Sequence, residues 1–192
     1  MDLALLTDLG LTLDRLSLEW ARLEPERGAH DPIAVRHYRD VLAAARPAGK
    51  SPWISLHHFT VPRWFLAAGG LLVEANRTDA CRRHVDFVAD TFADLAAGWQ
   101  PVSETNYYAR ATSGGRGWPP GHDDRAEVAA VNEAIHLANA EAAVRLGQIG
   151  APVASIFGLP PIVAEDDDPA TVSSGCPTAT PSNGRTSSAS WT

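Results

Sequence analysis

The sequence is poor in two residue types on which whole classes of protein depend. Its two cysteines, Cys81 and Cys176, are too few for a disulfide framework or a zinc cluster. Lys50 is its single lysine, so arginine carries nearly all of the positive charge. With 16 basic and 23 acidic residues the formal net charge is −7, which argues against a nucleic-acid partner or an anionic membrane surface.

Long hydrophobic runs are also missing. Arg, Asp, Gly or Pro interrupts every apolar stretch before it reaches the roughly 20 residues needed to cross a bilayer, so we expect no transmembrane helix. Asp2 and Asp8 stand where a secretory signal would carry bases, which predicts a cytoplasmic protein. Hydrophobic residues still make up 45% of the chain, which is enough for a folded core.

Helical and extended patterns alternate along the chain. We predict helices at residues 2–9, 32–45, 79–97 and 125–146, and strands at residues 11–18, 52–58, 99–103 and 152–159. This alternation predicts an α/β fold with parallel strands and right-handed helical crossovers. The predicted loops after the strands are long, and in such folds the functional groups lie beyond the carboxyl ends of the strands.

The C-terminal segment has a different composition. Residues 173–192 contain no Leu, Ile, Val, Phe or Met and are rich in Ser, Thr, Gly and Pro. A segment of this kind buries too little apolar surface to offset its ordering entropy. We therefore predict a folded domain over residues 1–172 and a disordered tail over residues 173–192.

One candidate acid follows the third predicted strand. Glu104 stands in the string WQPVSETNYYA of residues 99–109, between the hydrogen-bonding Ser103 and Asn106. A carboxyl group in a partly apolar cleft mouth holds its proton more firmly and can donate it. The alternative is an ordinary solvated loop acid.

Two further strings lie at the ends of the preceding strands. Adjacent residues on a strand point to opposite faces, so His57 and His58 should not bind one metal, and one ring should face the helical layer. A structural histidine is the alternative to a catalytic one.

Arg15 alternates with leucines, which favours an inward side chain over a surface one, and a buried guanidinium needs a carboxylate partner.

Taken together, these strings resemble glycoside hydrolase family 1, the β-glucosidase-type family. Residues 15–25 (RLSLEWARLEP) resemble its R-F-S-I-x-W-x-R-I-x-P second strand and loop, and residues 56–62 (LHHFTVP) resemble its L-x-H-F/W-x-x-P third strand. Residues 99–109 resemble its W-x-T-x-N-E-P-N-x-x-A fourth strand. The resemblance runs from about residue 2 to about residue 172.

The resemblance implies a (β/α)8 TIM barrel, here a partial one with about strands two to five, that hydrolyses β-glycosides with retention. Glu104 matches the acid/base, Arg15 the arginine that pairs with the nucleophile, and His58 a sugar-hydroxyl donor. Ser103 and Asn106 match the two asparagine positions beside the acid and are expected to bind substrate. The family needs no metal or cofactor, and the implied partner is a small β-glycoside or oligosaccharide.

The departures from the family pattern bear on activity. The family nucleophile lies in a T/I-x-E-N-G motif at strand seven, and this chain has no such motif. Ser103 replaces an asparagine whose contact with the sugar 2-hydroxyl strengthens in the transition state. Pro101 and Thr105 are further departures.

These features leave three hypotheses. The first is a β-glucosidase-like hydrolase whose present chain, an incomplete barrel, is inactive alone. The second is a catalytically inactive sugar-binding or non-functional chain, since Glu19 and Glu24 after the first predicted strand are poor substitutes for a strand-seven nucleophile. The third, an unrelated open α/β binding module, is disfavoured because no glycine-rich phosphate loop is present.

Overall fold

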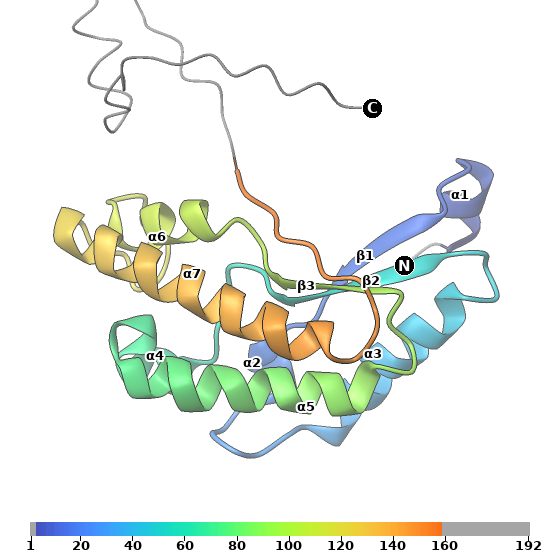
Figure 1. The fold of residues 1–192 in the computed structure, drawn as a ribbon, viewed down its shortest axis with the longest axis horizontal. Coiled ribbons are helices and arrows are strands. Elements are labelled where there is room, and N and C mark those ends of the chain that lie inside the picture. The colour runs from blue at the N-terminus through green and yellow to red at the C-terminus, as the bar shows by residue number, and fades with distance from the viewer. Residues whose placement is uncertain (1–2, 159–192) are drawn as a thin grey trace, which may run out of the picture. The chain divides into compact units, whose positions relative to one another are not determined.

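The computed structural model describes residues 3–158 of the chain (Figure 1). These residues belong to one compact unit, residues 1–158. The predicted disordered tail, the predicted domain boundary at residue 172 and the end of the fourth predicted strand lie outside the described residues.

Three parallel strands form the sheet: β1 (Leu13–Ser17), β2 (Ser51–His57) and β3 (Gly98–Val102), in the order β1-β2-β3. Long crossovers containing helices join them, as the alternating pattern predicted. Because all three strands run the same way, their carboxyl ends meet at one edge of the sheet.

The fourth predicted strand is not continuous, which corrects the sequence prediction. Residues 152–158 run beside β3 through two isolated bridges, Trp99 to Val153 and Ser103 to Ile156. Three backbone hydrogen bonds join them to residues 99–104: Trp99 N–H to the Pro152 carbonyl, Ala154 N–H to the Trp99 carbonyl, and Glu104 N–H to the Ile156 carbonyl. Pro101 lies between the two bridges and has no N–H to continue the ladder, so the pairing is interrupted there.

Seven α-helices are present in the described part. They are α1 (Leu3–Asp8), α2 (Trp20–Leu23), α3 (Pro32–Ala45), α4 (Arg63–Ala67), α5 (Arg82–Phe92), α6 (Thr105–Ser113) and α7 (Arg125–Gly147). The third predicted helix is shorter than expected, because a π-helical segment, Asn76–Cys81, precedes α5, which ends at Phe92. The segments after the three strands contain the short helices α2, α4 and α6, where the sequence pattern predicts only loops.

Two of the long helices begin at side-chain caps. The Asp31 carboxylate accepts the Ile33 N–H at 2.7 Å, and Pro32 supplies the first helical residue of α3. The Asp124 carboxylate caps α7 in the same way, accepting the Ala126 N–H at 2.8 Å. Each cap satisfies a backbone donor that has no partner inside the helix.

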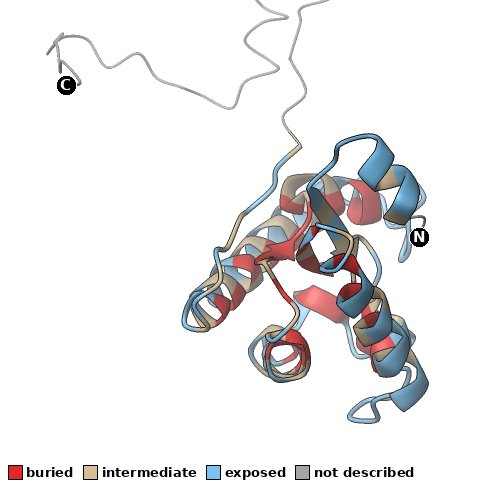
Figure 2. Cartoon of the chain, turned by 90° about the vertical axis from the view of Figure 1, so that its right-hand side faces the viewer, coloured by how far each residue is buried: buried red, intermediate tan, exposed pale blue. Residues whose placement is uncertain are grey.

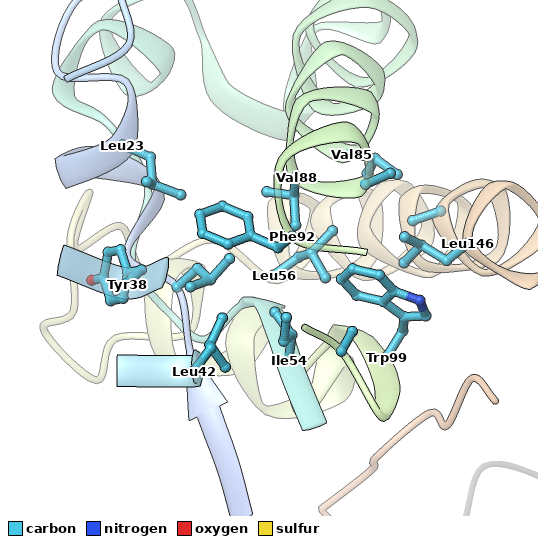
Figure 3. Packing of buried hydrophobic residues seen from close by; sticks show 14 residues of the cluster. Leu23, Tyr38, Leu42, Ile54, Leu56, Val85, Val88, Phe92, Trp99 and Leu146 are labelled. Atoms are coloured by element: carbon cyan, nitrogen blue, oxygen red, sulfur yellow. The ribbon is translucent and has the colours of Figure 1, made fainter. Parts of the chain in front are cut away.

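The main core lies between the sheet and α3, α5 and α7 (Figure 3). Ile54 and Leu56 of β2 and Trp99 of β3 are almost fully buried, and they pack with Phe92 of α5 and Leu146 of α7. Burial of one such side chain contributes roughly 1.5–3 kcal/mol. In Figure 2 the buried residues concentrate where the helices meet the sheet, whereas α1 buries no residue.

A second apolar cluster lies toward the carboxyl ends of the strands. It joins Trp20 of α2, Phe65 of α4, Tyr108 of α6 and Ile135 of α7. This cluster holds the short helices in place, and with them the loops that follow the strands. No helix of the described part lies on the opposite face of the sheet (Figure 1).

Candidate functional site

The candidate residues gather at the edge where the three strands end. His58 directly follows β2, and Glu104 follows β3 after one residue. The charges of Arg15 and Glu104 both shift the pKa of His58, so both side chains lie close enough to interact with this ring. The structure therefore brings together residues that lie far apart in the sequence.

Arg15 crosses the uncovered face of the sheet from β1 to β3. Its Nη1 donates to Gln100 Oε1 at 3.1 Å and to Ser103 Oγ at 3.5 Å. Its side chain is exposed, and within residues 3–158 it forms no ion pair. Its partners among the described residues are neutral oxygens, and the carboxylate partner that the sequence predicted is not found within residues 3–158.

Gln100 is a site residue that the sequence analysis missed. It is 1% exposed, it lies in β3, and its Nε2 finds no acceptor among the described residues. The sequence signal for this residue was a single amide side chain in an otherwise apolar strand. Burying an unpaired polar group costs free energy, so such a residue is expected to have a partner or a role. Its Oε1 is what holds Arg15 over the sheet.

His58 is half-buried and hydrogen-bonded, with 2.8 Å between its Nδ1 and Ser17 Oγ. Burial lowers the pKa of His58, the positive charge of Arg15 lowers it further, and Glu104 and Glu19 oppose the shift. The ring is therefore mostly neutral at neutral pH. A neutral imidazole that bonds Ser17 through one nitrogen keeps the other nitrogen available to a ligand hydroxyl.

His57 has a different environment, as the alternation of strand residues predicted. Both of its ring nitrogens are buried without a partner among the described residues, and its ring packs edge-on against Tyr108. Burial lowers the pKa of His57 to about 4, and the neighbouring His58 adds to the shift. His57 thus belongs to the helical layer and His58 to the candidate site.

Glu104 adopts a backbone conformation that is rare for a residue with a side chain. Its φ is 50° and its ψ is 59°, in the left-handed region. Its N–H donates to the Ile156 carbonyl, and its own carbonyl accepts the Tyr107 N–H that opens α6. Such conformations cost about 1–3 kcal/mol, persist only where their surroundings impose them, and cluster at functional sites.

The Glu104 carboxyl group lies next to Gly158. A Cβ on that glycine would lie 3.2 Å from Glu104 Oε2, which leaves a side chain little room there. Asn106 bonds both polar groups of Gly158, through Nδ2 to the carbonyl at 2.6 Å and through Oδ1 to the N–H at 3.2 Å. The Asn106 amide is thus bonded to the backbone beside the acid.

Ser103 is fully buried. Its N–H donates to the His57 carbonyl, and its Oγ accepts from Arg15. Two of the residues predicted to bind substrate, Ser103 and Asn106, therefore already have partners within the protein. Their roles toward a substrate stay predictions.

Three aromatic rings line the loops beside these residues. Phe59 lies 5.9 Å from Tyr107 and 5.1 Å from Trp118, and Tyr107 lies 5.7 Å from Trp118, all edge-to-face. Phe59 also contacts His58, with 4.6 Å between ring centroids. This aromatic cluster connects the histidine to the loop after α6.

The two glutamates after β1 have unequal surroundings. Glu24 is buried and accepts from Trp20 Nε1 and from the Gly28 N–H, both at 2.7 Å, so it is a structural acid. Glu19 is half-buried and acts on the His58 ring through its charge. Within residues 3–158 no group of three or more His, Cys, Asp or Glu side chains could hold a metal ion.

Solved structures resemble this fold closely. A beta-glycosidase from Pyrococcus horikoshii matches with a TM-score of 0.79 and 28% identity, covering 86% of this chain and 38% of that one. A beta-glucosidase from Thermotoga maritima, at 18% identity, matches in fold with a TM-score of 0.82 over 90% of this chain and 39% of its own. The arrangement is thus a consecutive part of a (β/α)8 barrel.

The sequence comparisons assign the family. The model for glycosyl hydrolase family 1 matches residues 1–159, and the chain belongs to this family of glycoside hydrolases. Among its relatives, the 6-phospho-beta-galactosidase 1 of Streptococcus pneumoniae is 30% identical over 78% of this chain and 32% of the relative. The human cytosolic beta-glucosidase is 30% identical over 62% of this chain and 26% of the relative. The chain spans about a third or less of these relatives.

No helix of the described part is both long enough and apolar enough to cross a membrane.

Proposed function

We propose that the chain contributes the acid/base side of a retaining β-glycosidase site of the β-glucosidase type. Glu104 would protonate the oxygen of the leaving group in the first step and activate water in the second. The observation that carries this proposal is the position of Glu104 after β3, held in a strained conformation beside His58 and Arg15. The likeness to a cytosolic beta-glucosidase supports a cytoplasmic location.

Each neighbour has a role in this proposal. His58 would bind a sugar hydroxyl through its free ring nitrogen, since its other nitrogen bonds Ser17. Arg15 would orient the nucleophile of a closed barrel, because its exposed guanidinium has only neutral partners within residues 3–158. Ser103 fixes Arg15 and would reach the sugar through water.

The nucleophile separates this proposal from its alternative. Retention needs a second carboxyl group about 5–5.5 Å from the acid, and the T/I-x-E-N-G motif that would supply it is absent from this sequence. Glu24 is engaged by Trp20 and Gly28, so it is not available. We therefore propose that the chain alone binds β-glycosides without turning them over, and the alternative is a chain that does not bind sugar at all.

A binding measurement with matched controls tests the proposal. Phenyl β-D-glucoside is titrated into the purified chain and into His58→Ala and Glu104→Gln variants, with His37→Ala and Glu26→Gln as exposed controls. We expect weaker binding in the two site variants and unchanged binding in the controls. Absence of binding in the unsubstituted chain, or equal effects in both pairs, would favour the alternative.

A further inference from the structure

A polar hollow of about 650 Å³ lies between α6, the loop that follows it and the first turns of α7. Three arginines line it, Arg110, Arg116 and Arg125, together with Asn106 and Asn132. No described carboxylate lines it, although the chain as a whole carries a formal net charge of −7. The hollow is thus a local concentration of positive charge on an acidic protein.

The charges of the three arginines are not neutralised within residues 3–158. None of the three takes part in an ion pair there, whereas Arg27 and Arg39 each pair with an aspartate. The Arg116 guanidinium lies over the Tyr107 ring, with 5.6 Å between its Cζ and the ring centroid. A contact of this kind positions a cation without removing its charge.

Two carboxylates at the start of α7 are engaged elsewhere. The Asp124 carboxylate accepts the Ala126 and Glu127 N–H groups and so caps α7. The Glu127 carboxylate accepts the Ser113 hydroxyl and bonds His122 Nδ1, both at 2.7 Å. The guanidinium groups that line the hollow therefore remain available to an anion from outside.

The hollow adjoins the candidate site on the side of the acid. Asn106 lines the hollow and also bonds Gly158, which lies against the Glu104 carboxyl group. A second line of contacts runs from His58 through Phe59 and Tyr107 to Arg116. Because the acid protonates the leaving-group oxygen, its own helix and loop belong to the leaving-group side of the scissile bond.

We propose that this hollow binds an anionic group, a carboxylate, phosphate or sulfate, carried by the leaving group of the β-glycoside. The inference rests on the proposed function, whose acid/base assignment defines the leaving-group side. Guanidinium groups suit such anions, because their planar N–H pairs match two oxygens at once. The amide of Asn132, which has no side-chain hydrogen bond within residues 3–158, adds a donor at the same wall.

A pair of isosteric glucosides tests the proposal. The chain is titrated with 4-carboxyphenyl β-D-glucoside and with the uncharged 4-carbamoylphenyl β-D-glucoside. We expect the carboxylate to bind about tenfold more tightly at low salt, since three exposed charge contacts each contribute a small gain. The preference should fall as salt is added, because screening weakens exposed charge pairs.

Two triple variants that remove the same amount of charge test whether the preference for the carboxylate arises in the hollow. Arg110, Arg116 and Arg125 are exposed, so replacing all three with Gln should leave the fold intact and abolish the preference. The control replaces Arg36, Arg46 and Arg82, which are exposed and lie outside the hollow, and should keep it. No preference in the unsubstituted chain, or equal loss in both triple variants, would overturn the proposal.

A third probe separates this inference from the proposed function. Free 4-hydroxybenzoate carries the anion without the sugar. If it binds and loses affinity only in the triple variant of the hollow, while neither glucoside binds, then the anion site stands and the glycosidase proposal fails. If the uncharged glucoside binds in a His58-dependent way and no anion preference is seen, the glycosidase proposal stands and the anion site fails.

Discussion

Asn106 binds Gly158 through both the N–H and the oxygen of its side-chain amide, in the way that a peptide group of a neighbouring strand would. Its Nδ2 donates to the glycine carbonyl at 2.6 Å, and its Oδ1 accepts the glycine N–H at 3.2 Å. The pairing takes over where the interrupted bridges of residues 152–158 end. It thereby positions the glycine that lies against the Glu104 carboxyl group.

This relationship predicts that Asn106→Ala loosens the chain beside the acid. Two hydrogen bonds are lost, each with a net contribution of about 1 kcal/mol. We expect faster hydrogen exchange of the Gly158 and Glu104 amides, measured by NMR, with little change for amides of α3. Asn132→Ala, on the neighbouring helix, is the control. Unchanged protection at Gly158 in Asn106→Ala would contradict the prediction.

The left-handed backbone of Glu104 favours glycine at this position, whereas the proposed chemistry needs the carboxyl group of a glutamate. Glycine adopts a positive φ without steric cost, so Glu104→Gly should raise the free energy of unfolding relative to Glu104→Ala by about 1 kcal/mol. Both variants lack the carboxyl group, so their difference isolates the backbone. Urea denaturation of the two variants measures it. An alanine variant as stable as the glycine variant would show that the backbone at this position relaxes without cost.

Turnover by the chain alone should be negligible. Removing one member of a cooperating catalytic set costs most of the rate, and general acid catalysis alone supplies only about 10²–10⁴-fold. The measurement is release of nitrophenol from 4-nitrophenyl β-D-glucoside by the purified chain, with Glu104→Gln as the control. Turnover of about one per second that disappears in Glu104→Gln would show that another carboxylate, such as Glu19, completes the site.

Two buried histidines predict acid sensitivity. In the folded chain, burial lowers the pKa of His57 to about 4 and that of His84 to about 3. In the unfolded chain, both pKa values return to the ordinary value of about 6.5. Between pH 6.5 and these folded values the unfolded chain binds more protons, so stability falls as pH falls. The stability is fully present above pH about 6.5, and at pH 4.8 each histidine contributes about 2 kcal/mol of the loss.

Urea denaturation at pH 7.5 and pH 4.8 measures this loss. Within this window the carboxylates with lowered pKa values, Asp94 and Glu127, stay mostly ionised in both the folded and the unfolded chain. His84→Phe should keep the stacking on Trp20 and reduce the pH dependence, while the exposed His37→Ala should leave it unchanged. The same pH dependence in all three proteins would exclude His84 as its cause.

Much of the fold follows from local pattern. Alternating helix and strand signals, Asp31 before Pro32, and the apolar faces of residues 32–45 and 125–146 all act within a few residues of sequence. Local steric and capping preferences therefore suffice to place α3, α7 and the parallel strands. The motif residues Arg15, His58 and Glu104 could likewise be singled out from their positions near strand ends.

Their surroundings were decided by the tertiary structure. Arg15 finds Gln100 and Ser103 rather than a carboxylate, because those partners come from a strand about 85 residues away, and no local pattern encodes that pairing. Pro101 interrupts the bridges to residues 152–158 only because that segment lies beside it. The left-handed backbone of Glu104 arises in the same way, since contacts from both sides impose a conformation that the residue itself disfavours.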